Sequence, residues 1–239
     1  MFLFIRMKKV YAVCAVLLIA CMIYVGRKET IPVAATPLSE PTYVIVVDAG
    51  HGEPDGGAVS STGVKESDIN LLVAKDLEAA LDSLGYSVIM TRQDENNIAD
   101  SDKQDTLRKM KVSDLSNRVK IVNSSDADMC ISIHMNKFAS EKYYGWQTFY
   151  NQNSEYNKIL AEKIQAGISN NIERKNDRVA LAIKDIKLTD ESKIPTAIVE
   201  CGFLSNPEDL KLLQTEAYRD QLVEGILEGI EAYYEEIYQ

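Results

Sequence analysis

The sequence predicts an α/β domain with a mostly parallel sheet that helices cover on both faces. Three observations support this prediction. Short apolar runs rich in β-branched residues alternate with amphipathic segments, 46% of the residues are hydrophobic, and only 12 glycines and 6 prolines occur among 239 residues. Strands buried on both faces are continuous apolar runs, and helices between them connect parallel strands. A chain of this composition can bury a sizeable core, which excludes disordered, collagenous and disulfide-framework proteins.

The expected elements follow one another from residue 43 to residue 238. Tyr43–Val47 is an apolar run typical of a buried strand, and Ser67–Leu84 has the spacing of a helix that stops at Gly85. A second strand at 86–91 precedes a polar excursion at 92–112. The remaining elements expected are a helix at 114–123, strands at 129–133 and 146–150, a helix at 156–172, a strand at 196–199 and one or two closing helices within 209–238.

Residues 1–28 are expected to form a signal anchor. The uncharged apolar run Val10–Val25 has basic residues on both sides, which is typical of an export signal or a membrane anchor. We expect an uncleaved anchor that tethers the body to the outer side of the cytoplasmic membrane. A cleaved signal is one alternative; another is a lipoprotein, because Leu18–Cys21 resembles a bacterial lipobox. Residues 29–42 contain three prolines and are expected to be an extended tether, which leaves a single domain at 43–239.

Charge and cysteine usage exclude further classes of protein. The net charge is −10, and residues 29–239 alone carry −15 because five of the basic residues and no acidic ones lie before residue 29. A body this acidic has no general attraction to nucleic acid or to anionic lipid. Cys130 and Cys201 each lie in an apolar segment, so we expect buried free thiols.

Both histidines of the chain stand just after a predicted buried strand. His51 follows the first strand, His134 directly follows MCISI, and a third apolar run, TAIV, ends in Glu200. Ligands and chemistry gather outside the carboxyl ends of strands in an open α/β sheet, so we expect these side chains to converge. Glu66 precedes the first helix and belongs to the same end of the sheet.

These residue types point to a metal-dependent hydrolase. Zinc hydrolases use three protein ligands drawn from His and Asp or Glu, and His51, Glu66 and His134 supply such a set for one zinc ion per chain. Zinc lowers the pKa of a bound water to about 7. A separate carboxylate must then carry the proton to the leaving nitrogen, and Glu200 fits this role because apolar surroundings raise the pKa of a carboxyl group.

Each candidate also has a structural alternative. A lone histidine is more often a surface or core residue than a ligand, and an acid at a helix start is favourable with the helix dipole. Asp48 either orders the turn after the first strand or holds a ligand histidine.

Two histidines and a carboxylate also suit Fe(II), so a non-haem iron oxygenase is an alternative. No G-K-[ST] or G-x-S-x-G motif is present, which disfavours a phosphate loop and a serine hydrolase.

Four segments carry a family resemblance. The strings VVDAGHGEPDGGA, GVKESDINL, SIHMN and IVECGFLSNPEDLKLL, in this order, resemble the zinc-dependent N-acetylmuramoyl-L-alanine amidases of the type 3 family over residues 43–235. The resemblance implies a sheet of about six strands, zinc ligands at His51, Glu66 and His134, and a catalytic glutamate at Glu200. Asn136 and Arg118 also match family positions, with substrate-binding or structural roles. The implied reaction is hydrolysis of the amide between N-acetylmuramic acid and the L-alanine of the peptidoglycan stem peptide.

Within this family the chain is similar to the CwlD-type amidases of endospore formers, which have one catalytic domain behind an amino-terminal membrane segment. That similarity implies removal of stem peptides before a deacetylase forms the muramic lactam of the spore cortex. No inserted autoinhibitory helix or wall-binding module is visible, so we expect an accessory activator protein or the membrane to direct the enzyme. Residues 177–193 depart from the family pattern beside the expected cleft, which leaves peptide selectivity open. A catalytically silent peptidoglycan-binding relative and a zinc peptidase acting within the stem peptide are the alternatives.

Overall fold

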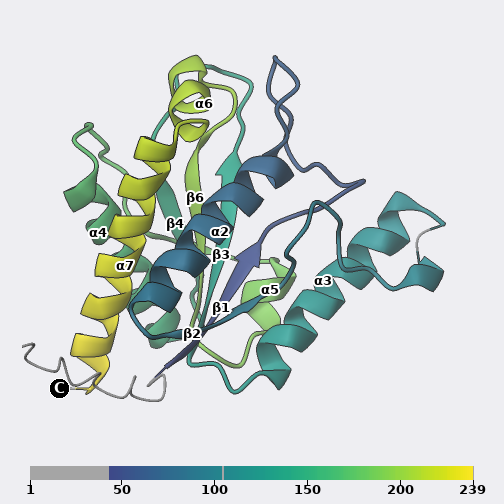
Figure 1. Ribbon diagram of the computed structural model, residues 1–239, viewed down its shortest axis with the longest axis horizontal. Coiled ribbons are helices and arrows are strands. Elements are labelled where there is room, and N and C mark those ends of the chain that lie inside the picture. Colours follow the sequence, from purple (N-terminus) through teal and green to yellow (C-terminus); the bar gives the residue numbers. More distant parts are fainter. Residues whose placement is uncertain (1–42, 104, 239) are drawn as a thin grey trace, which may run out of the picture. The chain divides into compact units, whose positions relative to one another are not determined.

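A six-stranded sheet between two layers of helices forms the body of the protein (Figure 1). The computed structural model describes residues 43–103 and 105–238. The strand order is β2-β1-β3-β6-β4-β5, and every neighbouring pair is parallel except β4 and β6, which are antiparallel. The predicted α/β class, the mostly parallel sheet and the count of about six strands are therefore confirmed.

The elements have the following bounds. The strands are β1 (Val44–Ala49), β2 (Ser87–Met90), β3 (Met129–Asn136), β4 (Gln147–Asn151), β5 (Leu181–Ile183) and β6 (Thr196–Phe203). The helices are α2 (Glu66–Ser83), the 3-10 turn η1 (Ser101–Lys103), α3 (Leu107–Ser124), α4 (Glu155–Asn171), α5 (Lys187–Glu191), α6 (Pro207–Leu213) and α7 (Glu216–Tyr238).

Two kinds of boundary differ from the prediction. The helix expected at 114–123 begins at Leu107, inside the expected polar excursion, because the Thr106 hydroxyl caps it by accepting from the Lys109 N–H. Strands β3 and β6 run past the expected ends at 133 and 199, because their ladder continues through the pair His134 and Glu200. These two side chains therefore lie within the last residues of their strands rather than beyond them.

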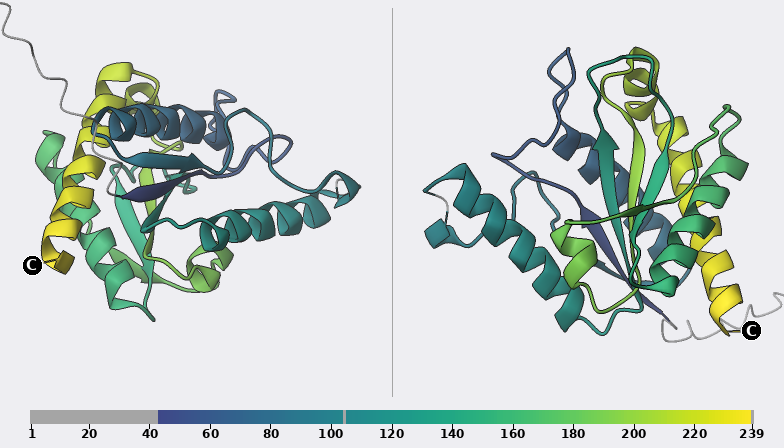
Figure 2. Two further views of the ribbon diagram at one scale, coloured as in Figure 1. Left: turned by 60° about the horizontal axis from the view of Figure 1, so that its bottom comes forward. Right: turned by 180° about the vertical axis from the view of Figure 1, so that it is seen from behind.

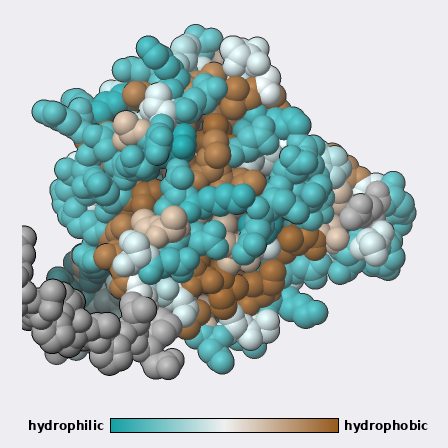
Figure 3. Space-filling model, in the orientation of Figure 1, coloured by the Kyte–Doolittle hydropathy of each residue, from teal (hydrophilic) through white to brown (hydrophobic). Residues whose placement is uncertain are grey.

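Helices cover both faces of the sheet (Figure 2). Helices α2, α4 and α7 pack on one face around a large apolar cluster, and α3 and α5 pack on the other around a smaller one. Helices α4 and α7 lie side by side. Their backbones approach so closely that a Cβ atom at Gly229 would overlap the backbone of Ile164. On the face shown in Figure 3, hydrophilic residues predominate, and apolar residues show between them near and below the centre.

Some predictions concern residues outside this description. The expected anchor at 1–28, with its lipobox-like segment Leu18–Cys21, and the tether at 29–42 lie outside the described residues. Within the part that the structure describes, no helix combines the length and apolar character that a bilayer crossing requires. Cys130 and Cys201 are buried free thiols, as predicted.

Candidate metal centre and active site

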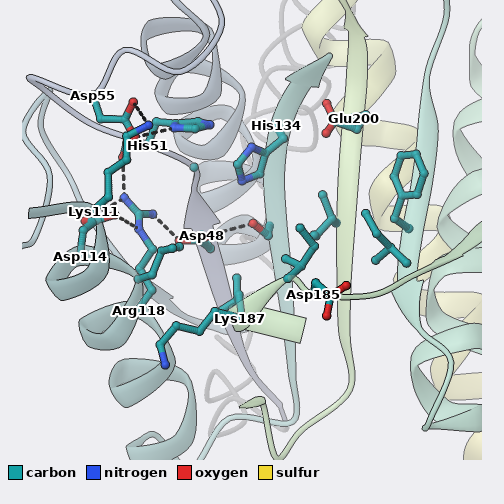
Figure 4. A pocket seen from close by; sticks show the side chains of 18 residues that line it. Asp48, His51, Asp55, Lys111, Asp114, Arg118, His134, Asp185, Lys187 and Glu200 are labelled. Atoms are coloured by element: carbon teal, nitrogen blue, oxygen red, sulfur yellow. Dashed lines mark hydrogen bonds and ion pairs between the residues drawn. The ribbon is translucent and has the colours of Figure 1, made fainter. Parts of the chain in front are cut away.

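The sheet brings together the four residues singled out in the sequence. His51 lies in the loop between β1 and α2, residues 50–65, which we call the ligand loop, and Glu66 is the first residue of α2. His134 and Glu200 are register partners on the adjacent strands β3 and β6. Because β1, β3 and β6 are neighbours in the sheet, His51, His134 and Glu200 line one cleft (Figure 4), and Glu66 lies behind the two histidines.

Three of these side chains form a donor set for a metal ion. Ligand atoms of His51, Glu66 and His134 all lie within 4.8 Å of one another. His134 Nδ1 is 2.9 Å and His51 Nε2 is 3.3 Å from Glu66 Oε1. A tetrahedral zinc ion with bonds of about 2.0 to 2.2 Å places its ligand atoms about 3.4 Å apart. The number, type and spacing of these donors therefore fit a zinc ion.

Glu66 is held in place by backbone groups. Its Oε2 accepts a hydrogen bond from the Ala58 N–H at 2.8 Å, and its Oε1 accepts one from the Met135 N–H at 3.2 Å. Burial by itself would raise the pKa of Glu66, but hydrogen bonds from His134 and His51 outweigh it and hold that pKa well below the ordinary value. The carboxylate is therefore ionised near neutral pH and positioned before any metal binds.

His51 occupies an unusual backbone conformation. Its φ is 60°, in the left-handed region that few side-chain-bearing residues adopt. Its Nδ1 lies 3.1 Å from Asp55 Oδ2, and its Nε2 faces Glu66. Burial would lower the pKa of His51, but the hydrogen bonds with Asp55 and Glu66 raise it to about 9. A metal ion at this site would replace the proton on Nε2.

Gly50, the residue before His51, must lack a side chain because the ring of His134 lies against it. A Cβ atom at Gly50 would overlap the imidazole ring of His134. The Gly50 N–H also donates to the Ile133 carbonyl, 3.1 Å away, which joins the start of the ligand loop to β3. The close approach of these two backbones sets the separation of the two histidine rings, whose centroids are 5.1 Å apart.

Glu200 has the properties of a proton carrier. Its Oε2 atom is buried and makes no hydrogen bond to any described residue. Burial raises the pKa of Glu200 to about 7. A carboxyl group that is half ionised near neutral pH can both accept and donate a proton during one reaction. A buried carboxylate oxygen without a partner is costly, so its placement beside the donor set favours the functional interpretation over a purely structural one.

The cleft has a volume of about 400 Å³ and two unlike walls. Helix α3 supplies one wall, including Lys111 and Leu115, and the segment from β5 to α5 supplies the other. Phe149 and Ile198 give it an apolar floor. Residues 183 and 185–188 line the second wall, so the divergent segment 177–193 borders the cleft as expected.

Arg118 has a structural position. Its side chain is only 2% exposed, and all five of its N–H groups have acceptors. The guanidinium contacts Asp48 Oδ1 at 2.5 Å and Asp114 Oδ2 at 2.8 Å, and it also donates to the Ala49 and His51 carbonyls. Of the two roles suggested by sequence, these contacts favour the structural one.

Asp48 orders the turn after β1 and contacts neither histidine. Its carboxylate accepts hydrogen bonds from Arg118, Ser132 and Thr91. Burial would raise the pKa of Asp48, but Arg118 and these hydroxyls lower it to about 2. Asp55, which the sequence reasoning did not single out, holds the ligand histidine instead. The spacing of four residues gave no signal, because the residues between His51 and Asp55 form a loop rather than a helix.

Asn136 lies at the end of β3, opposite Phe203. Its Oδ1 accepts a hydrogen bond from the Lys137 N–H at 2.8 Å. Among the described residues, those that line the cleft do not include Asn136. A substrate-binding role for Asn136 stays a prediction.

Comparisons with known proteins give the family of this chain. Residues 45–232 match the Amidase_3 family, N-acetylmuramoyl-L-alanine amidase. A germination-specific N-acetylmuramoyl-L-alanine amidase of Bacillus subtilis is 38% identical over 193 residues, 81% of this chain and 80% of that protein. The amidase LytC of Bacillus subtilis is 29% identical over 80% of this chain and 35% of its own length.

Solved structures of amidases are similar to this chain. The CwlD amidase of Clostridioides difficile, solved in complex with the GerS lipoprotein, superimposes with a TM-score of 0.78 at 36% identity, over 81% of this chain and 98% of that one. A second N-acetylmuramoyl-L-alanine amidase, from Clostridium difficile 630, gives a TM-score of 0.71 at 29% identity, over 82% and 98% of the two chains. The chain belongs to the N-acetylmuramoyl-L-alanine amidase family of type 3 and resembles its CwlD-type members.

Proposed function

We propose that this amidase uses one zinc ion, held by His51, Glu66 and His134, to cleave the amide between N-acetylmuramic acid and L-alanine of the stem peptide. The observation that carries the proposal is the His-Glu-His donor set, with ligand atoms within 4.8 Å, beside a buried Glu200 oxygen that lacks a partner. When bound there, zinc supplies a Lewis acid that polarises the amide carbonyl and acidifies water.

Glu200 is the proposed catalytic residue. Ionised Glu200 takes a proton from the attacking water and then delivers it to the amide nitrogen, because an amine leaves poorly unless it is protonated. Its pKa of about 7 lets it perform both transfers near neutral pH. The register pairing of Glu200 with His134 places the carboxylate beside the donor set.

The cleft supports a peptide as the leaving group. Its apolar floor of Phe149 and Ile198 suits the methyl group of L-alanine, and the walls from α3 and α5 carry Lys111 and Lys187. Lys111 is paired with Asp55, so the cation that suits a carboxylate of a stem peptide is Lys187, whose partner Glu191 is exposed. The same geometry would accommodate a peptidase that cuts within the stem peptide, so the products must be identified.

We further propose a role in maturation of the spore cortex, where removal of the stem peptide precedes muramic lactam formation. The support is the similarity to the germination-specific amidase of Bacillus subtilis and to the CwlD amidase. Since the latter was solved with the GerS lipoprotein, an accessory lipoprotein is the proposed kind of activator. The proposed location is outside the cytoplasm, with residues 1–28 as the membrane anchor and residues 29–42 as the tether.

Mass spectrometry of products tests this function. The purified full chain with zinc is incubated with peptidoglycan that bears stem peptides, and a chelated sample is the control. Intact stem peptides beginning with L-alanine, absent after chelation, are expected. Fragments cut within the stem peptide would identify a peptidase. No release from a fully zinc-loaded chain, with and without an accessory lipoprotein, would identify a silent relative. An oxidised product that forms only with iron and dioxygen would favour the oxygenase alternative.

A further inference from the structure

Helix α3 contacts the ligand loop along one of its faces. Lys111, Asp114 and Arg118 are three and four residues apart, so they project from the same side of the helix. Arg118 donates to the carbonyl of His51, and Lys111 Nζ lies 2.9 Å from Asp55 Oδ1. Figure 4 shows these side chains on the wall of the cleft, next to His51. The helix therefore touches the ligand loop both at the histidine itself and at the residue that contacts its ring.

Asp55 stands between the helix and the metal centre. One carboxylate oxygen lies 3.1 Å from His51 Nδ1, and the other lies within reach of Lys111 and of the Gly57 N–H, at 2.9 and 3.2 Å. The side chain is only 16% exposed. All these neighbours are donors to an ionised carboxylate, so each of them restrains its position.

The contact with Asp55 decides which ring nitrogen of His51 is free. An ionised carboxylate can only accept a hydrogen bond, so Nδ1 must carry the proton. The lone pair of a metal-binding imidazole then lies on Nε2, the atom that faces Glu66 at 3.3 Å. A partner on the far nitrogen also fixes the rotation of the ring.

We propose that Asp55 and Lys111 are positioning residues for the metal centre: Asp55 orients the His51 ring with Nε2 toward Glu66, and Lys111 links Asp55 to the position of helix α3. The inference rests on the proposed zinc function and adds a means of regulating it. A ligand that moved α3 would change the orientation of a metal-binding histidine without touching the metal.

The backbone of His51 makes this dependence on α3 stronger. Its φ of 60° is unfavourable for a residue with a Cβ atom and persists only where the surroundings enforce it. The hydrogen bond from Arg118 to the His51 carbonyl is one such restraint, and the ring contact with Asp55 is another. Both restraints depend on one face of α3, the first through Arg118 and the second through Lys111, which pairs with Asp55.

Zinc affinity tests the proposal directly. The full chain is titrated with zinc chloride in competition with a fluorescent chelator. Asp55→Ala is expected to weaken zinc binding about 10- to 100-fold, as loss of a carboxylate behind a ligand histidine does. Asp55→Asn keeps an acceptor for Nδ1 and should recover part of this loss. Lys111→Met removes a partly exposed ion pair and should weaken binding by up to about fivefold.

Two further variants separate this inference from the proposed function. Lys109→Met, on the same helix as Lys111, removes an exposed pair with Asp105 and should leave zinc affinity unchanged. His134→Ala removes a ligand and should abolish tight binding. Wild-type affinity in Asp55→Ala, with binding lost in His134→Ala, would overturn the positioning role alone. Tight zinc binding by His134→Ala would contradict the metal centre itself.

A spectroscopic measurement tests the proposal even if the Asp55 variants do not fold, because it uses the wild-type protein and Lys111→Met. The chain has two histidines, so the imidazole ¹⁵N spectrum of the zinc-loaded protein contains only two ring systems. We expect the proton of His51 on Nδ1, and in Lys111→Met we expect faster exchange of that proton with solvent. Zinc bound to His51 through Nδ1, or an unchanged exchange rate in Lys111→Met, would refute the proposal.

Discussion

The two faces of the sheet are covered by different kinds of residue. On the face of α2, α4 and α7, fully buried aliphatic side chains such as Leu77, Ile164 and Ile226 form one continuous cluster. On the face of α3 and α5 the apolar cluster is smaller, and beside it lie the buried ionised residues Asp48 and Arg118. The cleft opens on this second face.

The two faces of the sheet contribute differently to stability and to function. Burying a large aliphatic side chain stabilises the fold by about 1.5 to 3 kcal/mol. A buried ion pair contributes little net stability, because desolvation offsets the attraction between its charges. The first face therefore supplies most of the free energy of folding, and the second uses polar contacts to fix the metal ligands. The two faces should respond differently to mutation.

The largest expected effect is the loss of activity when Glu200, on the cleft face, is replaced, and this change should leave the fold intact. Glu200→Gln removes the proton carrier but no metal ligand. We expect the release of L-alanine-terminated peptides to fall about 100- to 10,000-fold, with zinc content and thermal unfolding unchanged. Glu224→Gln, at an exposed position on α7, is the control and should be fully active. An active Glu200→Gln enzyme would rule out the proposed mechanism.

Arg118→Met, also on the cleft face, should lower the free energy of unfolding. The substitution leaves Asp48 buried without its cationic partner, and breaking such a pair costs about 3 to 5 kcal/mol. Urea unfolding should report this loss. Arg108→Met, at an exposed position on the same helix, should change the free energy of unfolding little. Equal unfolding of wild type and Arg118→Met would mean that the pair is not structurally important.

Acid should weaken the same pair. Asp48 has a pKa of about 2 in the folded chain, below the ordinary value of 3.8. The depressed pKa contributes about 2 kcal/mol of stability above pH 4. This contribution is lost as the pH falls from about 4 through 2, where the carboxylate becomes protonated. Urea unfolding between pH 5 and pH 2.5 should show a steeper loss in wild type than in Arg118→Met, and parallel slopes would argue against the assignment to Asp48.

Features set by local sequence could be predicted, and features set by distant contacts could not. The buried strands are continuous apolar runs, and the order of strands and helices implies that their carboxyl ends meet, which is why the sequence located His51, His134 and Glu200. Strand β5 was missed because it is three residues long and exists through its pairing with β4. The start of α3 was missed because residues 107–113 mix basic and apolar side chains without clear helical periodicity.

The role of Asp55 shows the same limit within the site. Nothing in the spacing of His51 and Asp55 indicates contact, because the segment between them is a loop whose path depends on bonds to residues 95–97. Arg118 also needed the structure, since its acceptors Asp48 and Asp114 lie 70 and four residues away in the chain. Sequence patterns identified the residue types of the metal centre, and tertiary contacts determined how each ring is held.

The last expected effect is on the packed face, is similar in size to the effect of acid, and should spare the site. At Gly229 an added methyl group would overlap the backbone of Ile164 in α4, so the two helices must separate. We expect Gly229→Ala to lower the free energy of unfolding by about 1 to 3 kcal/mol, as overpacking does. Glu224→Ala, five residues away and exposed, should have little effect. Zinc affinity of the folded Gly229→Ala protein should equal that of wild type, because Gly229 lies between α7 and α4, on the face of the sheet opposite the cleft. A folded variant with weakened zinc binding would show that the two faces are coupled through the sheet, and the division between a stabilising face and a functional face would fail.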